Sequence, residues 1–194
     1  MSINSLHQIN LEKLFLELSQ VFNGNSEIEK ISSQELRAKA KAALTVTEEN
    51  PLSDDITSVM RADDAHPICS EILKTPFNWV PPETSNSNLY KKHSHFKAHV
   101  ELLGPDGLIK SNIVRLGLYG MQSPSEYGIR SHPAEEIYEM LAGGCCQTNE
   151  PKHQYSFDEF FYEVTKERHS VRAASRLSLN VLRFERDLCE LNRL

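Results

Sequence analysis

Apolar residues recur at spacings of three and four along the first part of the chain, which is the pattern of one face of a helix. This stripe consists of Leu6, Ile9, Leu11, Leu14, Phe15, Leu18, Val21 and Phe22. Gly24 follows between two asparagines and is a residue type that often ends a helix, because it adopts a positive φ without strain. The pattern therefore predicts an amphipathic helix that ends near Gly24.

Shorter helices are predicted between this point and residue 85. Ser32 and Glu35 have the spacing of a capping box ahead of an alanine-rich run, so a second helix is expected to begin there. Ser53 precedes two aspartates and further apolar residues, which indicates the start of a third helix. A fourth helix is expected over residues 67–73. Prolines and a polar run then interrupt the pattern, and we place the end of a helical segment, residues 1–85, at this break.

From His95 onward the period changes from that of a helix to that of a strand. The apolar side of the first strand carries Phe96, Ala98, Val100 and Leu102, and the polar side carries His95, Lys97, His99 and Glu101. Further strands are expected over residues 113–121, 136–141, 159–165, 169–172 and 177–184. Short strands separated by turns predict a small β-barrel over residues 86–190, covered in part by the helical segment.

Composition and charge narrow the classes of partner. The chain has 194 residues with 21 Lys and Arg against 27 Asp and Glu, and the net charge of −6 disfavours nucleic acid or an anionic membrane as the main partner. We see no apolar run of about 18 residues that could cross a bilayer and no secretory leader, so a cytoplasmic location is expected. The 4 cysteines match no zinc pattern and are expected to be reduced thiols. Exposed barrel edges and the apolar N-terminal helix favour a homodimer, although the sequence does not determine the oligomeric state.

The residue types best suited to metal binding or catalysis lie around residue 136. Glu136 and Tyr138 are expected on the same face of a strand, because side chains alternate along it. His132 comes shortly before Glu136, and His169 lies in a later strand region. Two imidazoles and a carboxylate from neighbouring strands can hold a divalent ion such as Zn, Fe, Mn, Co or Ni. From the spacing alone, a buried hydrogen-bonded network without a metal is an equally good interpretation.

The segment from His132 to Gly143 has the form His-x-x-x-Glu followed by six residues and Gly, and it resembles the first motif of the cupin superfamily. The stretches LGLYGM and SEYGIRSHPAEEIYEMLAG, with HVELLGPDG and WVPP upstream, resemble the cupin-type dimethylsulfoniopropionate lyases. The resemblance covers most of the chain and is closest over residues 89–143. It implies a mainly β fold, a small cupin barrel preceded by an α-helical segment.

The resemblance also implies roles for individual residues. His132, Glu136 and His169 would hold one divalent transition-metal ion. Tyr138 would lie at or beside the metal, as a ligand or as the general base, and Tyr127 would line the substrate pocket. The implied reaction is a β-elimination that releases dimethyl sulfide from a small-molecule substrate, dimethylsulfoniopropionate, and leaves acrylate.

Elementary chemistry agrees with this assignment. A cation near a phenol favours the phenolate, so a tyrosine beside a metal can act as a base well below its ordinary pKa of about 10. The sulfonium group of the substrate is a soft cation, which an aromatic face attracts by roughly 0.5–2 kcal/mol. The aromatic candidates for this contact are Tyr127, Tyr138, Trp79 and Tyr90. For a tryptophan such as Trp79, core packing is the more ordinary role.

Two departures from the cupin motifs leave alternative functions open. The first motif usually begins His-x-His, and here Arg130 stands at the first position. Of the second motif, only His169 remains. A metal cupin of another activity (an isomerase, a dioxygenase or a lyase for another small carboxylate) and a ligand-binding cupin without catalysis are therefore the alternatives.

A second histidine cluster competes with the predicted site. His93, His95 and His99 fall on one face of the predicted strand, and one of them could replace the ligand lost at Arg130. Lys97 shares that face and would repel a metal cation, while the opposite face is apolar. A solvent-exposed polar strand face is therefore the simpler prediction for these histidines.

Overall fold

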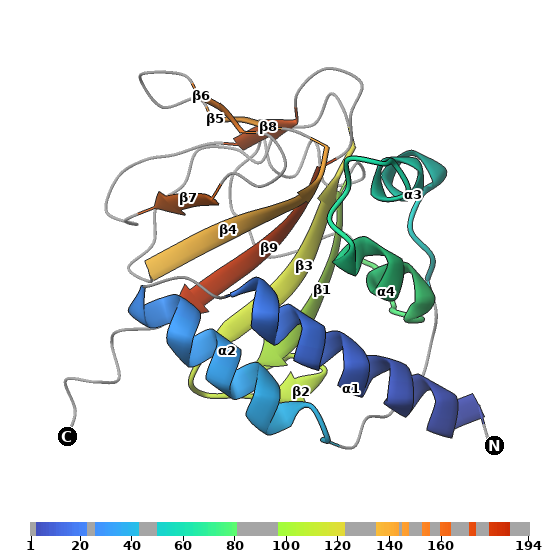
Figure 1. The fold of residues 1–194 in the computed structure, drawn as a ribbon, viewed down its shortest axis with the longest axis vertical. Coiled ribbons are helices and arrows are strands. Elements are labelled where there is room, and N and C mark those ends of the chain that lie inside the picture. The colour runs from blue at the N-terminus through green and yellow to red at the C-terminus, as the bar shows by residue number, and fades with distance from the viewer. Residues whose placement is uncertain are drawn as a thin grey trace.

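The computed structural model describes residues 3–22, 26–42, 50–80, 97–122, 135–143, 145–147, 153–155, 160–163, 171–173 and 179–186. Within these ranges helices come first and strands follow, as the sequence pattern predicts (Figure 1). The helices are α1 (Ile3–Val21), α2 (Glu27–Lys39), α3 (Asp54–Met60) and α4 (Ile68–Lys74). The predicted boundary near residue 85 lies outside the described residues.

The strands form a larger and a smaller sheet. The larger one is six-stranded, in the order β2-β1-β3-β9-β4-β7, and the smaller one is three-stranded, in the order β6-β5-β8. The strands are β1 (Lys97–Gly104), β2 (Ile109–Lys110), β3 (Arg115–Met121), β4 (Glu135–Ala142), β5 (Cys145–Gln147), β6 (His153–Tyr155), β7 (Phe160–Glu163), β8 (Val171–Ala173) and β9 (Leu179–Arg186). Neighbouring strands are antiparallel except β1 and β2. The smaller sheet lies at the end of the larger sheet that is remote from α1 and α2 (Figure 1).

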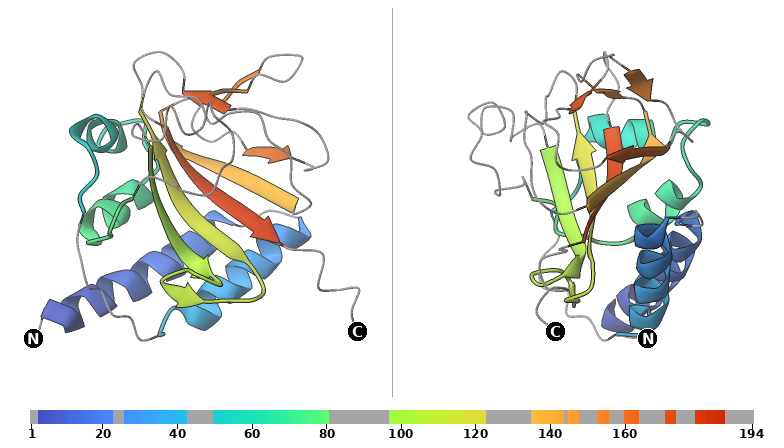
Figure 2. Two further views of the ribbon diagram at one scale, coloured as in Figure 1. Left: turned by 180° about the vertical axis from the view of Figure 1, so that it is seen from behind. Right: turned by 90° about the vertical axis from the view of Figure 1, so that its left-hand side faces the viewer.

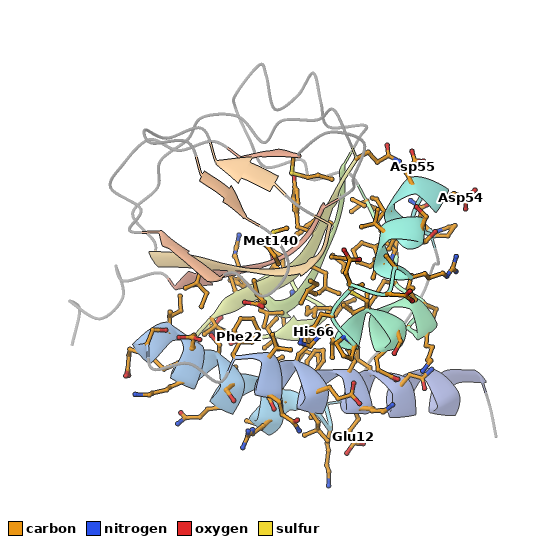
Figure 3. All side chains as sticks on the ribbon, turned by 45° about the horizontal axis from the view of Figure 1, so that its top comes forward. Glu12, Phe22, Asp54, Asp55, His66 and Met140 are labelled. Carbon is orange, nitrogen blue, oxygen red and sulfur yellow. The ribbon has the colours of Figure 1, made fainter. Side chains whose placement is uncertain are left out.

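The helices cover one face of the six-stranded sheet (Figure 2). Leu14, Phe15 and Leu18 of α1 are fully buried, as are Leu102 of β1 and Leu116 of β3. All five belong to one hydrophobic core cluster, so the helices and the sheet stabilise each other. Figure 3 shows side chains filling the space between the helices and the sheet, with Phe22 and His66 labelled there.

The second helix begins earlier than the capping pattern at Ser32 predicts. Ser26 is the N-cap: its Oγ accepts a hydrogen bond from the Glu29 backbone N–H at 3.3 Å, and its own N–H donates to the Glu29 carboxylate at 3.1 Å. Ser32 is buried inside the helix, where its hydroxyl donates to the Ile28 carbonyl. Ser26 and Ser32 each precede a glutamate by three residues. The helix begins at the earlier serine because the added turn buries Ile28 completely in the hydrophobic core.

The remaining elements follow the predictions with shifted ends. Ser53 caps α3 by accepting from the Ile56 N–H at 3.5 Å, and α4 occupies the predicted fourth helix. Strands β1, β3, β4, β7, β8 and β9 lie where alternation predicts strands, whereas β2, β5 and β6 were not predicted. At 3 residues each, β5 and β6 are too short for a two-residue period to be distinguished from a loop. None of the helices that the structure describes combines the length and apolarity needed to cross a bilayer.

Candidate active site

The candidate site lies on the face of the six-stranded sheet that is turned away from the helices, which we call the inner face. Strand β4 shows how residues alternate between the two faces. Ile137 and Leu141 are buried in the core that the helices cover. Glu136, Tyr138 and the fully buried Met140 alternate with them and therefore belong to the inner face. Glu136 and Tyr138 thus share one face of a strand, as the sequence predicts.

The cross-strand neighbours of Glu136 and Tyr138 are charged or aromatic. They are Arg183 and Phe161 beside Tyr138, and Glu185 and Glu163 beside Glu136. Directly paired residues of an antiparallel sheet have Cβ atoms about 4.5–5.5 Å apart. The three glutamates therefore form one row of positions across β7, β4 and β9 on the inner face. The adjacent row across the same strands holds two aromatic residues and an arginine.

His99 of β1 also belongs to the inner face, where its ring contacts Tyr119 of β3. The two ring centroids are 6.0 Å apart and the ring planes are inclined at 52°. Tyr119 is 4% exposed, Met121 is 1% exposed and Met140 is 0% exposed, so this part of the inner face is covered. His99 itself is partly exposed, so the predicted solvent-exposed polar face is only partly buried at this position, beside Tyr119.

Several predicted site residues lie outside the described residues. These are Tyr90, His93, His95, Tyr127, Arg130, His132 and His169. Among the side chains that the structure does describe, no three His, Cys, Asp or Glu residues gather as a metal site. His132 and His169 are not among those side chains, so the predicted metal site stays a prediction.

Trp79 is described, and it lies in the hydrophobic core cluster with an exposed fraction of 6%. Its ring packs edge-on against Phe77, with centroids 5.7 Å apart and planes at 88°. Its backbone N–H donates to the Asn50 carbonyl at 3.0 Å. These contacts give Trp79 a packing role, and its predicted contact with a substrate cation stays a prediction.

Helix α4 supports β4 from behind, on the face opposite the site. The Leu141 carbonyl accepts a hydrogen bond from the His66 backbone N–H at 2.7 Å and a longer one from the Cys69 thiol at 3.5 Å. Burial raises the pKa of Cys69 to about 12, so its thiol stays protonated and can donate. Cys69 is a free cysteine with a structural role, and these contacts fix the strand that carries Glu136 and Tyr138.

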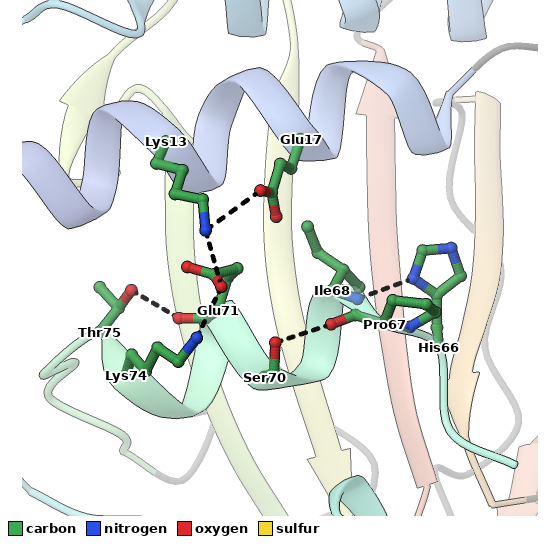
Figure 4. Close-up of polar contacts among 9 residues, drawn as sticks. All are labelled: Lys13, Glu17, His66, Pro67, Ile68, Ser70, Glu71, Lys74 and Thr75. Carbon is green, nitrogen blue, oxygen red and sulfur yellow. Dashed lines mark hydrogen bonds and ion pairs between the residues drawn. The ribbon is translucent and has the colours of Figure 1, made fainter. Parts of the chain in front are cut away.

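A groove of about 520 Å³ lies between α1 and α4, on the helical side of the sheet. Figure 4 shows its polar contacts, in which Glu71 of α4 accepts from Lys13 and Lys74, both at 2.8 Å. At the other end of α4, Nδ1 of His66 accepts from the Ile68 backbone N–H at 3.1 Å. These groups are already paired with one another, and the groove lies behind the sheet from the inner face, so we do not assign it to the candidate active site.

A curved sheet with a chemically rich inner face, helices on its outer face and a second small sheet at one end is the architecture of a small cupin, the predicted fold class. A dimethylsulfoniopropionate lyase family model matches residues 30–179. The chain therefore belongs to the dimethylsulfoniopropionate lyase family. The predicted enzyme class, a carbon–sulfur lyase, is confirmed by this match.

Solved structures with the same fold include dimethylsulfoniopropionate lyases. The chain is similar to DMSP lyase DddQ from Ruegeria pomeroyi DSS-3, with a TM-score of 0.63 and 18% identity over 94% of this chain and 93% of that chain. A structure from a study of the DMSP lyases RdDddP and RnDddQII gives a TM-score of 0.60 and 16% identity over 93% of this chain and 94% of that chain. Similarity at these identities shows the shared fold. A search of curated protein sequences finds no match.

Sequence analysis missed one charged position beside the candidate base. Arg183 is the cross-strand neighbour of both Tyr138 and Gly117. The alternation within β9 could have placed Arg183 on a face of that strand. It could not have placed Arg183 beside Tyr138, because that neighbourhood depends on the register between two strands that are far apart in the sequence.

Proposed function

We propose that this chain cleaves dimethylsulfoniopropionate into dimethyl sulfide and acrylate, with one divalent transition-metal ion and with Tyr138 as the general base. The observation that carries the proposal is the placement of Glu136 and Tyr138 on the inner face of the sheet, in a chain whose family match spans residues 30–179. The family supplies the reaction class, and the inner face supplies positions for a carboxylate ligand and a phenol in adjacent rows.

The donor set fits a first-row divalent metal. His132, Glu136 and His169 would hold the ion, and imidazole and carboxylate suit Zn, Fe, Mn, Co and Ni alike. Glu136, Glu163 and Glu185 occupy neighbouring positions of one row, and Arg115 of β3 occupies the next position, beside Glu185. A bound ion would stabilise the negative charge that develops on the substrate carboxylate when the neighbouring carbon loses a proton.

Tyr138 carries out the proton transfer in this proposal. Its phenolate oxygen takes the proton from the carbon next to the carboxylate, and the released electron pair forms the carbon–carbon double bond. The carbon–sulfur bond breaks, and dimethyl sulfide leaves with that bond's electrons. Arg183 occupies the cross-strand position next to Tyr138.

Aromatic positions would receive the sulfonium end of the substrate. Phe161 pairs with Tyr138 across β4 and β7, which puts two aromatic residues side by side on the inner face. Each aromatic ring adds about 0.5–2 kcal/mol of attraction for a cation. Tyr127 and Tyr90 join them as further predicted contacts. A small-molecule substrate, a cytoplasmic location and a homodimer belong to this proposal as expectations.

The direct test is release of dimethyl sulfide. Metal-loaded protein incubated with dimethylsulfoniopropionate should release the gas into the headspace, and chelation should abolish this activity until a divalent transition metal is restored. Elemental analysis of the same sample gives the metal content. Protein that contains stoichiometric metal and produces no gas above background would exclude the proposed reaction.

Substitution of the base tests the mechanism separately. Tyr138→Phe should lower kcat by about 10²- to 10⁴-fold, the usual contribution of a general base, while the metal content stays unchanged. Tyr162→Phe is the matched control, because Tyr162 pairs with Ile137 on the opposite face of the same two strands. Full turnover by the Tyr138→Phe variant would show that another group is the base.

A further inference from the structure

Strand β4 contains a β-bulge at Leu141, shortly after the position of the candidate base. Met140 pairs with Val181 of β9, and Ala142 pairs with the adjacent residue of β9, Asn180, so Leu141 is an extra residue on β4. Leu141 and Ala142 are consecutive, yet both are 0% exposed and both belong to the core cluster that the helices share. The bulge therefore interrupts the alternation of side chains between the two faces of the sheet.

Two donors around the start of α4 hold the backbone of this bulge. The Leu141 carbonyl accepts from the His66 backbone N–H at 2.7 Å and from the Cys69 thiol at 3.5 Å. Cys69 is 1% exposed, so water replaces its thiol poorly. Nδ1 of His66 accepts from the Ile68 N–H at 3.1 Å, which stabilises the turn that carries both donors (Figure 4). The extra residue of a bulge is left out of the regular ladder, and here α4 holds it instead.

The bulge sets the register of the part of β4 that precedes it. Up to Met140 the strand pairs residue for residue with β9, and Tyr138 pairs with Arg183. A slip of one residue exchanges the faces of all side chains in a strand. If β4 lost its bulge by moving one residue along β9, the positions of Glu136 and Tyr138 would turn from the inner face to the helical side. The hydrogen bonds from α4 oppose that slip, because they hold the extra residue, Leu141, in place.

We propose that Cys69, acting through the bulge at Leu141, is a positioning residue for Tyr138, and that α4 thereby keeps the candidate base on the inner face. The catalytic consequence rests on the proposed function, whereas the hold of α4 on β4 is independent of the reaction. Misplacement of a reacting group by about 1 Å can cost roughly 10²-fold in rate, so even a small movement of β4 would lower turnover. Burial raises the pKa of the Cys69 thiol to about 12, so the thiol remains a donor at neutral pH.

Release of dimethyl sulfide by three variants of the metal-loaded protein tests the role of Cys69. Cys69→Ala removes the donor to Leu141 and should lower kcat per bound metal ion by about ten- to hundredfold, with KM nearly unchanged. Cys69→Ser keeps a donor at the same place and should restore most of the lost kcat. Ile72→Val is the matched control and should keep the wild-type kcat. It also removes a single buried heavy atom from α4, where Ile72 is 2% exposed, but it leaves both hydrogen bonds to Leu141 in place.

Hydrogen exchange of the backbone amides tests the hold on β4 without requiring turnover. Strand β1 is the internal reference, because a general loss of stability accelerates exchange in both strands, whereas local opening accelerates it in β4 alone. Relative to β1, the amides of β4 should exchange about tenfold faster in Cys69→Ala than in the wild type. They should exchange at the wild-type ratio in Cys69→Ser and in Ile72→Val.

The combined outcomes separate this inference from the proposed function. An unchanged ratio of exchange between β4 and β1 in Cys69→Ala would overturn the hold, and so would a Cys69→Ser variant that behaves like Cys69→Ala. Faster exchange in β4 with a wild-type kcat would overturn the positioning of Tyr138. Faster exchange in β4 of Cys69→Ala, when even the wild type releases no dimethyl sulfide, would leave the hold standing and remove the proposed function instead.

Discussion

At the scale of single residues, Glu71 shows how a largely buried carboxylate joins two helices. Its Oε1 lies 2.8 Å from the ammonium groups of both Lys13 on α1 and Lys74 on α4. The hydrogen bond from Lys13, followed by the one from Lys74, lowers the pKa of Glu71 below its ordinary value of 4.5. Because the charged form is favoured in the folded state, these contacts stabilise the fold above that ordinary value and lose their effect as the pH falls through the lowered pKa.

Glu71→Gln should therefore reduce stability in a pH-dependent way. The expected loss is about 0.5–1 kcal/mol at neutral pH, the range for ion pairs at a surface. The difference from wild type should shrink at acidic pH, as the pH falls through the lowered pKa of Glu71 and the carboxyl group becomes protonated in the folded chain as it already is in the unfolded one. Urea unfolding at the two pH values measures this, and Glu12→Gln on α1 is the control. An equal loss at both pH values would show that packing, and not charge, is what Glu71 contributes.

At the scale of elements, buried hydrogen bonds decide how α2 is attached to the rest of the fold. The Ser33 hydroxyl donates to the Ser19 carbonyl of α1 at 2.6 Å. On the other side, Ser111 of the loop between β2 and β3 donates its hydroxyl to the Glu35 carboxylate at 2.8 Å. The same hydroxyl oxygen accepts from the Ile113 N–H at 3.2 Å, so it organises the loop as well as the contact with the helix.

Ser111→Ala should destabilise the protein by about 1–3 kcal/mol, because the buried Glu35 carboxylate loses a donor and the loop loses an acceptor. Ser111 is 4% exposed and Glu35 is 8% exposed, so water replaces these partners poorly. Asn112→Ala, which removes a polar side chain at the exposed neighbouring position of the same loop, is the control and should change stability by less than about 0.5 kcal/mol. Equal free energies of unfolding for the two variants would contradict the assigned role of Ser111.

At the scale of the whole molecule, the two faces of the six-stranded sheet have different functions. The outer face carries the core shared with α1 to α4, and the inner face carries the charged and aromatic positions of the candidate active site. Burial of apolar area on the outer face thus stabilises the fold. The inner face can carry polar and charged groups, although burying such groups lowers the stability of the fold. The hydrogen bonds of α4 to the Leu141 carbonyl connect the two functions through β4.

Leu18→Ala should test how far this shared core determines stability. Leu18 is fully buried in the core between α1 and the sheet, and the substitution should cost about 2–5 kcal/mol through lost burial and a cavity. Leu16→Ala is the matched control on the same helix, because Leu16 is 42% exposed, and it should cost less than about 1 kcal/mol. Denaturant unfolding measures both. A small loss for Leu18→Ala would mean that the helices are not needed to stabilise the sheet.

Local patterns were enough to predict most of the elements and the faces of single strands. The spacing of apolar residues in α1, the cap at Ser53 and the alternation that puts Glu136 and Tyr138 together all depend on contacts within a few residues along the chain. The first cap of α2 was mistaken because Ser26 and Ser32 carry the same local signal, and only the burial of Ile28 in the core cluster distinguishes them. When two capping sequences are equally strong, tertiary packing decides which one begins the helix, and the spacing of residues along the chain does not report that packing.

What the sequence determined by itself was the order of helices and strands, the polar and apolar sides of each element, and, through its motifs, the family. The tertiary structure alone decided that the polar side of β1 is partly buried at His99, that Trp79 lies in the core, and that Arg183 pairs with Tyr138. The physical reason is the distance along the chain over which the deciding interactions act. Helical and strand periods arise from neighbours along the chain, whereas register and layer packing arise from hydrogen bonds and contacts between segments that the chain brings together only on folding.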